Sequence, residues 1–133
     1  MKKIKILVCR VGQAPEVQEV EDPWKFTKEL IGEGSLIEVT RLDDGAEVFS
    51  DEEGMLKDLP LNRVIPAVGK KIPPGWDFVV KSSPNLCEPG ETGWWTFRGD
   101  FIITRHDPHR DAPLSLLDED IEKYTKLFAG QKS

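Results

Sequence analysis

Hydrophobic and polar residues alternate through the first part of the chain in a pattern that is typical of β-hairpins. Residues 3–10 alternate lysine with isoleucine and then become an apolar run, which predicts a buried strand. Glycine and proline at residues 12–15 indicate a turn, after which residues 16–20 form the returning strand. Residues 36–49 contain several β-branched residues and an Asp-Asp-Gly turn, which predicts a second hairpin. The first part of the chain is therefore expected to form two antiparallel strand pairs.

A helix is predicted between the two hairpins, at about residues 23–31. Asp22 is a residue type that caps helices, and Pro23 is favoured at the first helical position. Gly32 ends the pattern, because glycine readily adopts the backbone conformation that follows a helix. The apolar face of this helix is expected to consist of Trp24, Phe26, Leu30 and Ile31.

A second helix is predicted at about residues 117–129, near the end of the sequence. Either Ser115 or Asp118 is expected to cap its start, and Gly130 is expected to end it. Acidic residues occupy its first turn and lysines follow later, which suits the helix dipole. Because its apolar residues recur at helical spacing, this helix is expected to pack on the sheet. The apolar stripe consists of Leu117, Ile121, Tyr124 and Phe128.

Turn-forming residues are concentrated in a long Pro/Gly-rich insertion at about residues 66–93. Within this insertion, residues 76–81 predict one strand. Residues 99–105 are a strongly β-like run, and Gly99 indicates a bulge or a place where another group approaches the backbone closely. The sum is a single α+β domain over residues 1–133, with a mainly antiparallel sheet of about five or six strands and two helices.

Charge is distributed unevenly along this chain of 133 residues, whose formal net charge is −6. Residues 16–58 carry four basic and fourteen acidic residues, whereas residues 59–110 carry seven basic and five acidic residues. A non-specific nucleic-acid binder requires a net basic face, so the composition disfavours that function. No apolar run approaches the ~20 residues that a membrane span needs, so no membrane partner is expected. Because two cysteines provide no disulfide framework, we expect a cytoplasmic protein with reduced thiols.

The sequence Leu-Pro-Leu-Asn-Arg, which ends at Arg63, offers a candidate anion-binding group. The Arg63 guanidinium is always charged and has a planar set of donors that suits carboxylate and phosphate groups. Asn62 adds a donor and an acceptor, and Pro60 makes the approach to the pair rigid. One interpretation is that the pair binds an anionic or nucleotide ligand. The alternative is a structural ion pair between Arg63 and Glu52 or Glu53.

Tryptophan and basic residues are frequent in the same part of the chain as this pair. Aromatic rings and guanidinium groups suit a nucleobase and its phosphates, so this region is a candidate nucleotide site. Trp94 and Trp95 are adjacent on a predicted strand and point to opposite faces, so that one can be core while the other is exposed. The alternative is that these rings, together with Trp76, pack under the long loop. The predicted ligand-binding residues are Asn62, Arg63, Lys70, Lys71, Trp94, Trp95 and Arg98.

The sequence offers little that is typical of a catalytic or metal site. It contains no Walker-type phosphate loop, no Rossmann glycine pattern and no paired-cysteine metal motif. His106 and His109 are three residues apart beside aspartates, but a proline separates them, and a solvated polar loop is the simpler interpretation. Cys87 has no sequence neighbour that would activate it as a nucleophile, and Cys9 lies in a predicted buried strand. We therefore expect no catalytic residues, no metal and no cofactor.

Several short segments follow one another in the order found in a known family. They are Lys-Ile-Leu-Val in the first strand and residues 36–39, 51–56, 59–63, 99–103 and 115–124. On these segments the chain resembles domain-of-unknown-function family 3846, small proteins common in phages and mobile elements. The insertion at residues 66–93 departs from the resemblance, because members are expected to be shorter there. The resemblance implies a phage or mobile-element setting and no established activity, so it provides no catalytic residues.

Three functional hypotheses follow. The leading one is a small non-enzymatic binding protein that interferes with host defence, either by sequestering a nucleotide-like signal or by binding a host defence protein. The first alternative is an enzyme that acts on a nucleotide or phosphoester, with Arg63 and Arg98 on the phosphate. The second is an acidic nucleic-acid mimic that uses residues 16–58. We expect a monomer or a homodimer.

Overall fold

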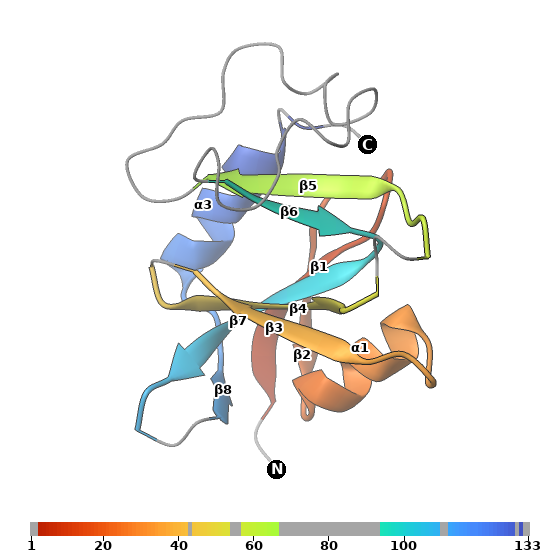
Figure 1. The fold of residues 1–133 in the computed structure, drawn as a ribbon. Coiled ribbons are helices and arrows are strands. Elements are labelled where there is room, and N and C mark those ends of the chain that lie inside the picture. Colours follow the sequence, from red (N-terminus) through yellow and green to blue (C-terminus); the bar gives the residue numbers. More distant parts are fainter. Residues whose placement is uncertain are drawn as a thin grey trace.

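The computed structural model describes residues 3–42, 44–53, 57–66, 94–109, 112–129 and 131. Within these residues the chain forms eight strands and two helices, which are labelled in Figure 1. In chain order they are β1 (Ile4–Cys9), β2 (Glu16–Val20), α1 (Pro23–Ile31), β3 (Ile37–Arg41), β4 (Ala46–Asp51), β5 (Leu61–Pro66), β6 (Trp94–Arg98), β7 (Phe101–Asp107), β8 (Ala112–Leu114) and α3 (Asp118–Ala129).

Six of the strands form one antiparallel sheet in the order β2-β1-β7-β4-β3, and β8 also pairs with β7. Strand β7 lies between the two predicted hairpins, β1–β2 and β3–β4, and joins them into one sheet. On one side of β7, β1 pairs with its first half and β8 with its second half. Strands β5 and β6 form a separate antiparallel pair. The predicted α+β class and mainly antiparallel sheet are confirmed.

The six-stranded sheet is covered on both faces, as Figure 1 shows with α1 and α3 on opposite sides. Ile6 and Val8 of β1 belong to the cluster beneath α1, whereas Leu7 and Cys9 belong to the cluster beneath α3 and the β5–β6 pair. Successive residues of a strand point to opposite faces, so a strand with two covered faces requires a continuous apolar run. This explains why β1 changes from an alternating pattern to Ile-Leu-Val-Cys.

Helix α1 has the predicted bounds and the predicted start. Asp22 Oδ1 accepts a hydrogen bond from the Lys25 backbone N–H at 3.1 Å, and Pro23 occupies the first turn. The predicted apolar face is wrong for Trp24, which is 46% exposed. Phe26 and Leu30 pack against the sheet. Trp24 lies at the first turn of the helix, where its ring meets the Phe49 ring edge-on.

Helix α3 packs on the opposite face through Tyr124 and Phe128, as predicted. Its start differs from the prediction, because the Asp120 carboxylate accepts from the Leu117 N–H at 2.9 Å. The Ser115 hydroxyl instead accepts a hydrogen bond from the Lys5 N–H at 2.9 Å, so it holds the helix approach against β1. Leu117 was predicted in the apolar stripe but is 50% exposed, because it precedes the first turn that reaches the sheet.

The predicted strand over residues 99–105 begins at Phe101, because a sharp turn lies at Gly99. Strand β6 ends before Gly99, whose φ of 72° lies in the left-handed region, and β7 begins after it. The backbone is also approached closely at this point, because an added Cβ would lie 2.8 Å from Leu59 Cδ1. The prediction of a close approach is therefore confirmed. The strand predicted at residues 76–81 lies outside the described residues, as does the insertion between residues 67 and 93.

Candidate functional site

Asn62 lies in the interior between β5, β1 and the Gly99 turn. The pairing of β5 with β6 shifts between Leu61 and Arg63, which makes Asn62 the extra residue of a β-bulge. Its side chain is fully buried, and its Nδ2 donates to the Cys9 carbonyl at 2.9 Å and to the Gly99 carbonyl at 2.8 Å. The amide therefore joins three chain segments that are far apart in the sequence.

Arg63 is also buried, with only 3% of its surface exposed. Its Nη1 donates to the carbonyl and to the Oδ1 of Asn62, at 2.9 and 2.8 Å, and its Nη2 donates to the Gln13 carbonyl at 2.8 Å. The guanidinium lies 5.7 Å from the centre of the Phe128 ring. Burial lowers the pKa of Arg63, while the Cys9 thiol acts in the opposite direction. The described hydrogen bonds of Arg63 go to two backbone carbonyls and to the Asn62 side chain. The structural alternative had assumed the carboxylates of Glu52 or Glu53 as partners instead.

Cys9 lies next to this pair in the buried strand β1. Burial raises the pKa of its thiol to about 12, the Arg63 charge opposes this shift, and the Asp100 carboxylate adds to it. Asp100 accepts a hydrogen bond from the Val11 N–H at 2.9 Å through its Oδ1. Because the thiolate is the nucleophilic form, Cys9 is inert at neutral pH. Its position matches the predicted core cysteine.

The remaining predicted ligand-binding residues are only partly covered by the structure. Arg98 lies in β6 opposite Leu61, and its Nη1 donates to the Leu59 carbonyl at 3.1 Å. The backbones of Trp94 and Trp95 lie in β6, but their side chains are not among the described atoms. Lys70 and Lys71 lie outside the described residues. The structure thus places Asn62, Arg63 and Arg98 on the paired strands β5 and β6, and an anion-binding role for the set stays a prediction.

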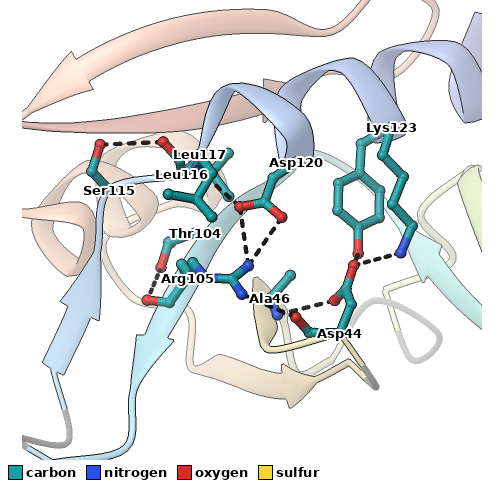
Figure 2. A network of polar contacts seen from close by, with 10 residues as sticks. Asp44, Ala46, Thr104, Arg105, Ser115, Leu116, Leu117, Asp120 and Lys123 are labelled. Carbon is teal, nitrogen blue, oxygen red and sulfur yellow. Dashed lines mark hydrogen bonds and ion pairs between the residues drawn. The ribbon is translucent and has the colours of Figure 1, made fainter.

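A second polar network fastens α3 to the turn between β3 and β4 (Figure 2). Asp44 Oδ2 accepts hydrogen bonds from the Tyr124 hydroxyl and from Lys123 Nζ, both at 2.6 Å. Arg105 Nη1 donates to both carboxylate oxygens of Asp120, at 3.0 and 3.1 Å. Its Nη2 donates to the Asp44 carbonyl at 3.3 Å. We call these five residues the α3 staple.

The pKa values in the α3 staple reflect this arrangement. Burial tends to raise the pKa of Asp44, but hydrogen bonds from Lys123, Tyr124 and the Ala46 N–H together lower it below its usual value. The pKa of Tyr124 is raised by burial and by its hydrogen bond to Asp44. Both shifts keep Asp44 charged and Tyr124 neutral, which is the combination that the hydrogen bond requires. The staple is therefore a structural feature.

A small hollow of about 200 Å³ near the Gly99 turn contains two carboxylates, Asp51 and Asp100. Lys57 Nζ lies 2.8 Å from Asp51 Oδ2 and donates to the Ser35 hydroxyl at 2.7 Å. A serine next to a lysine can form a nucleophile and base, but here the lysine is also engaged by the Asp51 carboxylate. Asp100 already accepts from the Val11 N–H. The polar groups of the hollow therefore suit a structural role better than a catalytic one.

A larger cavity bounded by described residues is a cleft of about 620 Å³ on the face of the sheet that carries α1. It lies between the start of α1, strands β3 and β4, and β8, whose places are visible in Figure 1. We call it the α1 cleft. Its volume is typical of sites that bind small molecules or side chains of a partner. The residues that give it its character are Trp24, Val39, Phe49, Glu21, Asp22 and Glu47.

The α1 cleft has an apolar part that is open to solvent. Trp24 is 46% exposed and Val39 is 40% exposed. The Trp24 and Phe49 rings meet edge-to-face, with centres 5.6 Å apart and planes at 73°. A large aromatic ring that is held in place and half exposed is typical of a surface that binds a partner.

The charged part of the α1 cleft is predominantly acidic. Glu21, Asp22 and Glu47 contribute carboxylates, and Arg41 contributes one basic group. Glu47 is buried in the floor, and its Oε2 lies 3.1 Å from His106 Nδ1. The formal balance in the lining is two negative charges, one positive subtracted from three negative, when His106 is neutral. The cleft therefore favours a ligand with an apolar part and a positive charge.

Local sequence patterns do not predict this cleft, because its lining comes from five elements, β1, α1, β3, β4 and β8. In the sequence, the carboxylates of residues 16–58 suggested a nucleic-acid mimic. Most described carboxylates of that segment are exposed, but Glu47 and Asp51 are buried. His106 was a candidate metal ligand. The described residues contain no group of three His, Cys, Asp or Glu side chains that could hold a metal ion.

The chain matches the profile of one protein family, described as a domain of unknown function (DUF3846), over residues 4–129. No curated protein and no solved structure matches it. Among the described residues, no helix has the length and apolar character needed to cross a membrane. The comparisons assign no activity, so a function must be inferred from the geometry of the chain itself.

Proposed function

The chain belongs to the DUF3846 family, a domain of unknown function, and we propose that it is a small non-enzymatic binding protein whose α1 cleft recognises a protein partner. The observation that supports this proposal is the combination of a half-exposed Trp24 and Val39 with three carboxylates around one cavity. In a phage or mobile-element setting, the partner would be a component of host defence.

Several buried polar groups are occupied by contacts within the fold. Asp51 is paired with Lys57, and the Cys9 thiol is held in its unreactive form by burial. Asn62 and Arg63 hold backbone carbonyls through their described hydrogen bonds. The groups that an enzyme would use as base, nucleophile or phosphate clamp are thus engaged in stabilising the fold.

A second candidate is the sequestration of a nucleotide-like signal in the same cleft. The half-exposed Trp24 ring and Arg41 both line the cleft and suit a nucleobase with a phosphate, and the cavity has a suitable volume. The carboxylates of Glu21, Asp22 and Glu47 oppose this, because they repel phosphate at short range. Protein recognition is therefore the better supported of the two candidates.

The experiment is affinity capture from a host-cell lysate with quantitative mass spectrometry, using the natural chain, Trp24→Ala and Leu117→Ala. Leu117 is the matched control, since it is 50% exposed and lies outside the cleft at the approach to α3. A partner of the cleft is expected to fall by about tenfold or more with Trp24→Ala, because buried interface tryptophans often dominate affinity. The same partner should still be captured by the Leu117→Ala chain.

Two outcomes would count against the proposal. One is a set of captured proteins that is the same for all three chains. The other is a rise in melting temperature with free nucleotides that disappears in Trp24→Ala, which would assign the cleft to the second candidate. Melting temperatures of the variants without ligand should be measured beside them, so that a folding defect is recognised.

A further inference from the structure

Strand β3 is an edge strand, because among the described strands it pairs only with β4. At its two ends the Leu42 N–H donates to the Ala46 carbonyl, and the Glu52 N–H donates to the Leu36 carbonyl. In an antiparallel pair, hydrogen-bonded and non-bonded positions alternate along the strand. The even-numbered residues of β3 therefore bond to β4, and the N–H and C=O groups of Ile37 and Val39 point away from the sheet.

Val39 combines this outward backbone with a side chain in the α1 cleft. Its side chain is 40% exposed and lines the cleft together with Trp24 and Phe49. A strand added to β3 would continue the alternation of the sheet, so every second side chain would point towards the cleft. The edge and the cleft are therefore adjacent parts of one surface.

The charges around the cleft determine which side chains would suit it. The apolar part at Trp24 and Val39 accepts an aliphatic or aromatic side chain, and burial of such a group is favourable. The carboxylates of Glu21, Asp22 and Glu47 favour a basic side chain nearby. Alternate residues of an extended segment supply both groups when they are two positions apart.

Strand β2, at the other end of the strand order, differs from β3 in what lies beside its exposed valine. Each of the two strands carries two charged residues in five positions. Val17 of β2 is 44% exposed but is not part of the α1 cleft, whereas Val39 of β3 lines the cleft. An edge that exposes an aliphatic side chain beside a cleft is the arrangement expected of a strand-accepting edge.

We propose that the α1 cleft and the outer edge of β3 form one site that binds an extended segment of a partner protein as an added strand. The segment places an apolar and a basic side chain, two residues apart, in the cleft. This inference rests on the proposed function and specifies its partner as an extended basic-apolar segment.

The test uses a displayed library of random linear peptides, selected on the purified chain and depleted on Trp24→Ala. A selected peptide is then synthesised with an N-methyl group at each position in turn, and its affinity is measured by fluorescence anisotropy. Methylation is expected to weaken binding by about tenfold at every second position, because each lost hydrogen bond and the methyl contact add up. N-methylation at the positions between should leave the affinity unchanged. A ligand that binds as a helix would not show this alternation.

Variants of the protein test the same site from the other side. Val39→Pro removes an outward N–H without removing a bond to β4. It should therefore weaken binding more than Val39→Thr, which also changes the side chain in the cleft but keeps the donor. Glu47→Gln should weaken the binding of a basic peptide and reduce the dependence of that binding on salt concentration. Glu38→Gln is the control, because it makes the same change of charge on the exposed opposite face of β3.

The outcomes separate the two proposals. Peptides that need Trp24 but ignore both the N-methyl pattern and Val39→Pro would overturn strand addition and leave cleft binding in place. If the library gives no peptide that depends on Trp24, the extended-segment inference is wrong, and the lysate capture alone decides the proposed function. A chain that sediments as a dimer and becomes monomeric in Val39→Pro would assign the edge to a second copy, which also overturns the inference.

Discussion

Gly99 is the residue at which the smallest change should have a clear structural effect. Its φ of 72° is unfavourable for any side chain, and an added Cβ would lie 2.8 Å from Leu59 Cδ1. Gly12 has nearly the same φ, 76°, but nothing lies within 4 Å of the added atom. We expect Gly12→Ala to lower the free energy of unfolding by about 1 kcal/mol through backbone strain.

Gly99→Ala should lower the free energy of unfolding by about 2–3 kcal/mol, because Leu59 must also move. Urea denaturation of both variants measures the difference. Equal losses would mean that Leu59 adapts without cost and that strain alone makes glycine necessary at this turn.

Asn62 is expected to matter for stability because its amide satisfies two buried carbonyls. In Asn62→Ala the carbonyls of Cys9 and Gly99 lose their described donor, so the free energy of unfolding should fall by about 2–4 kcal/mol. Gln18→Ala is the control, because that side chain bonds to Glu16 at the exposed surface and its removal should change stability by about 0.5 kcal/mol or less. An Asn62→Ala chain as stable as the control would contradict the assigned role.

At the scale of single residues, the sequence identified the Asn62-Arg63 pair as notable. It did not show in which direction the two side chains point. A turn-like Leu-Pro-Leu approach is compatible with an exposed pair, and the glutamates at positions 52 and 53 suggest an ion pair. The β-bulge in β5 overturns the expectation of an exposed pair, because Asn62 is the extra residue of the bulge and its side chain points inward. Bulges depend on the partner strand, β6, which is separated from β5 by the long insertion, so short-range patterns contain no information about them.

At the scale of elements, the α3 staple should make the attachment of α3 to the β3–β4 turn sensitive to acid. The native pKa of Asp44 lies below its ordinary value of 3.8, so the contribution of Asp44 to stability is present above that pH and is lost as the pH falls through the native pKa. We expect Asp44→Asn to lower the free energy of unfolding by about 1–2 kcal/mol at about pH 7. The loss should shrink between about pH 4 and pH 2.

Urea denaturation of both chains across this pH range measures the effect. Tyr124→Phe is the informative companion, since it removes one hydrogen bond that lowers the pKa of Asp44 and should weaken the pH dependence. If the difference between the natural chain and Asp44→Asn were the same at all pH values, the hydrogen bonds of the staple would have no preference for the charged carboxylate.

Most elements were predictable because their signals are local. Helix α1 begins and ends as Asp22, Pro23 and Gly32 indicate, and both hairpins have turns that glycine marks. The errors concern which side of an element is covered. Trp24 and Leu117 fit the helical periodicity but lie at helix starts, where the neighbouring layer does not reach. Periodicity predicts a face and cannot predict how far the opposite layer extends.

At the scale of the whole molecule, the class of the fold followed from the patterns but the order of the strands did not. The sheet depends on β7 pairing with β1 and β4, across separations of about ninety and fifty residues. Such pairings are long-range, and many strand orders satisfy the same alternation. The α1 cleft depends on that order, because β8 and β3 reach it from opposite ends of the chain. It could therefore not be found before the topology was known.

Cys9 offers a measurement of how the whole molecule opens. It lies in β1 with no exposed surface, packed beneath α3 and the β5–β6 pair, and its thiol pKa is raised to about 12. Labelling requires the thiolate, so at about pH 8 a native thiol would be ionised only about once in ten thousand molecules even if a reagent reached it. In a Cys87→Ser background, we expect Cys9 to react with a disulfide reagent only through unfolding.

The labelling rate, followed by absorbance, should therefore rise with urea with the slope of global unfolding measured by circular dichroism. A rate that is independent of urea would show instead that β1 separates locally from its cover. Since Asn62 bonds to the carbonyl of Cys9 itself, Asn62→Ala distinguishes the two routes. Under global unfolding it should accelerate labelling by the factor that its loss of stability predicts, whereas under local opening the acceleration should exceed that factor.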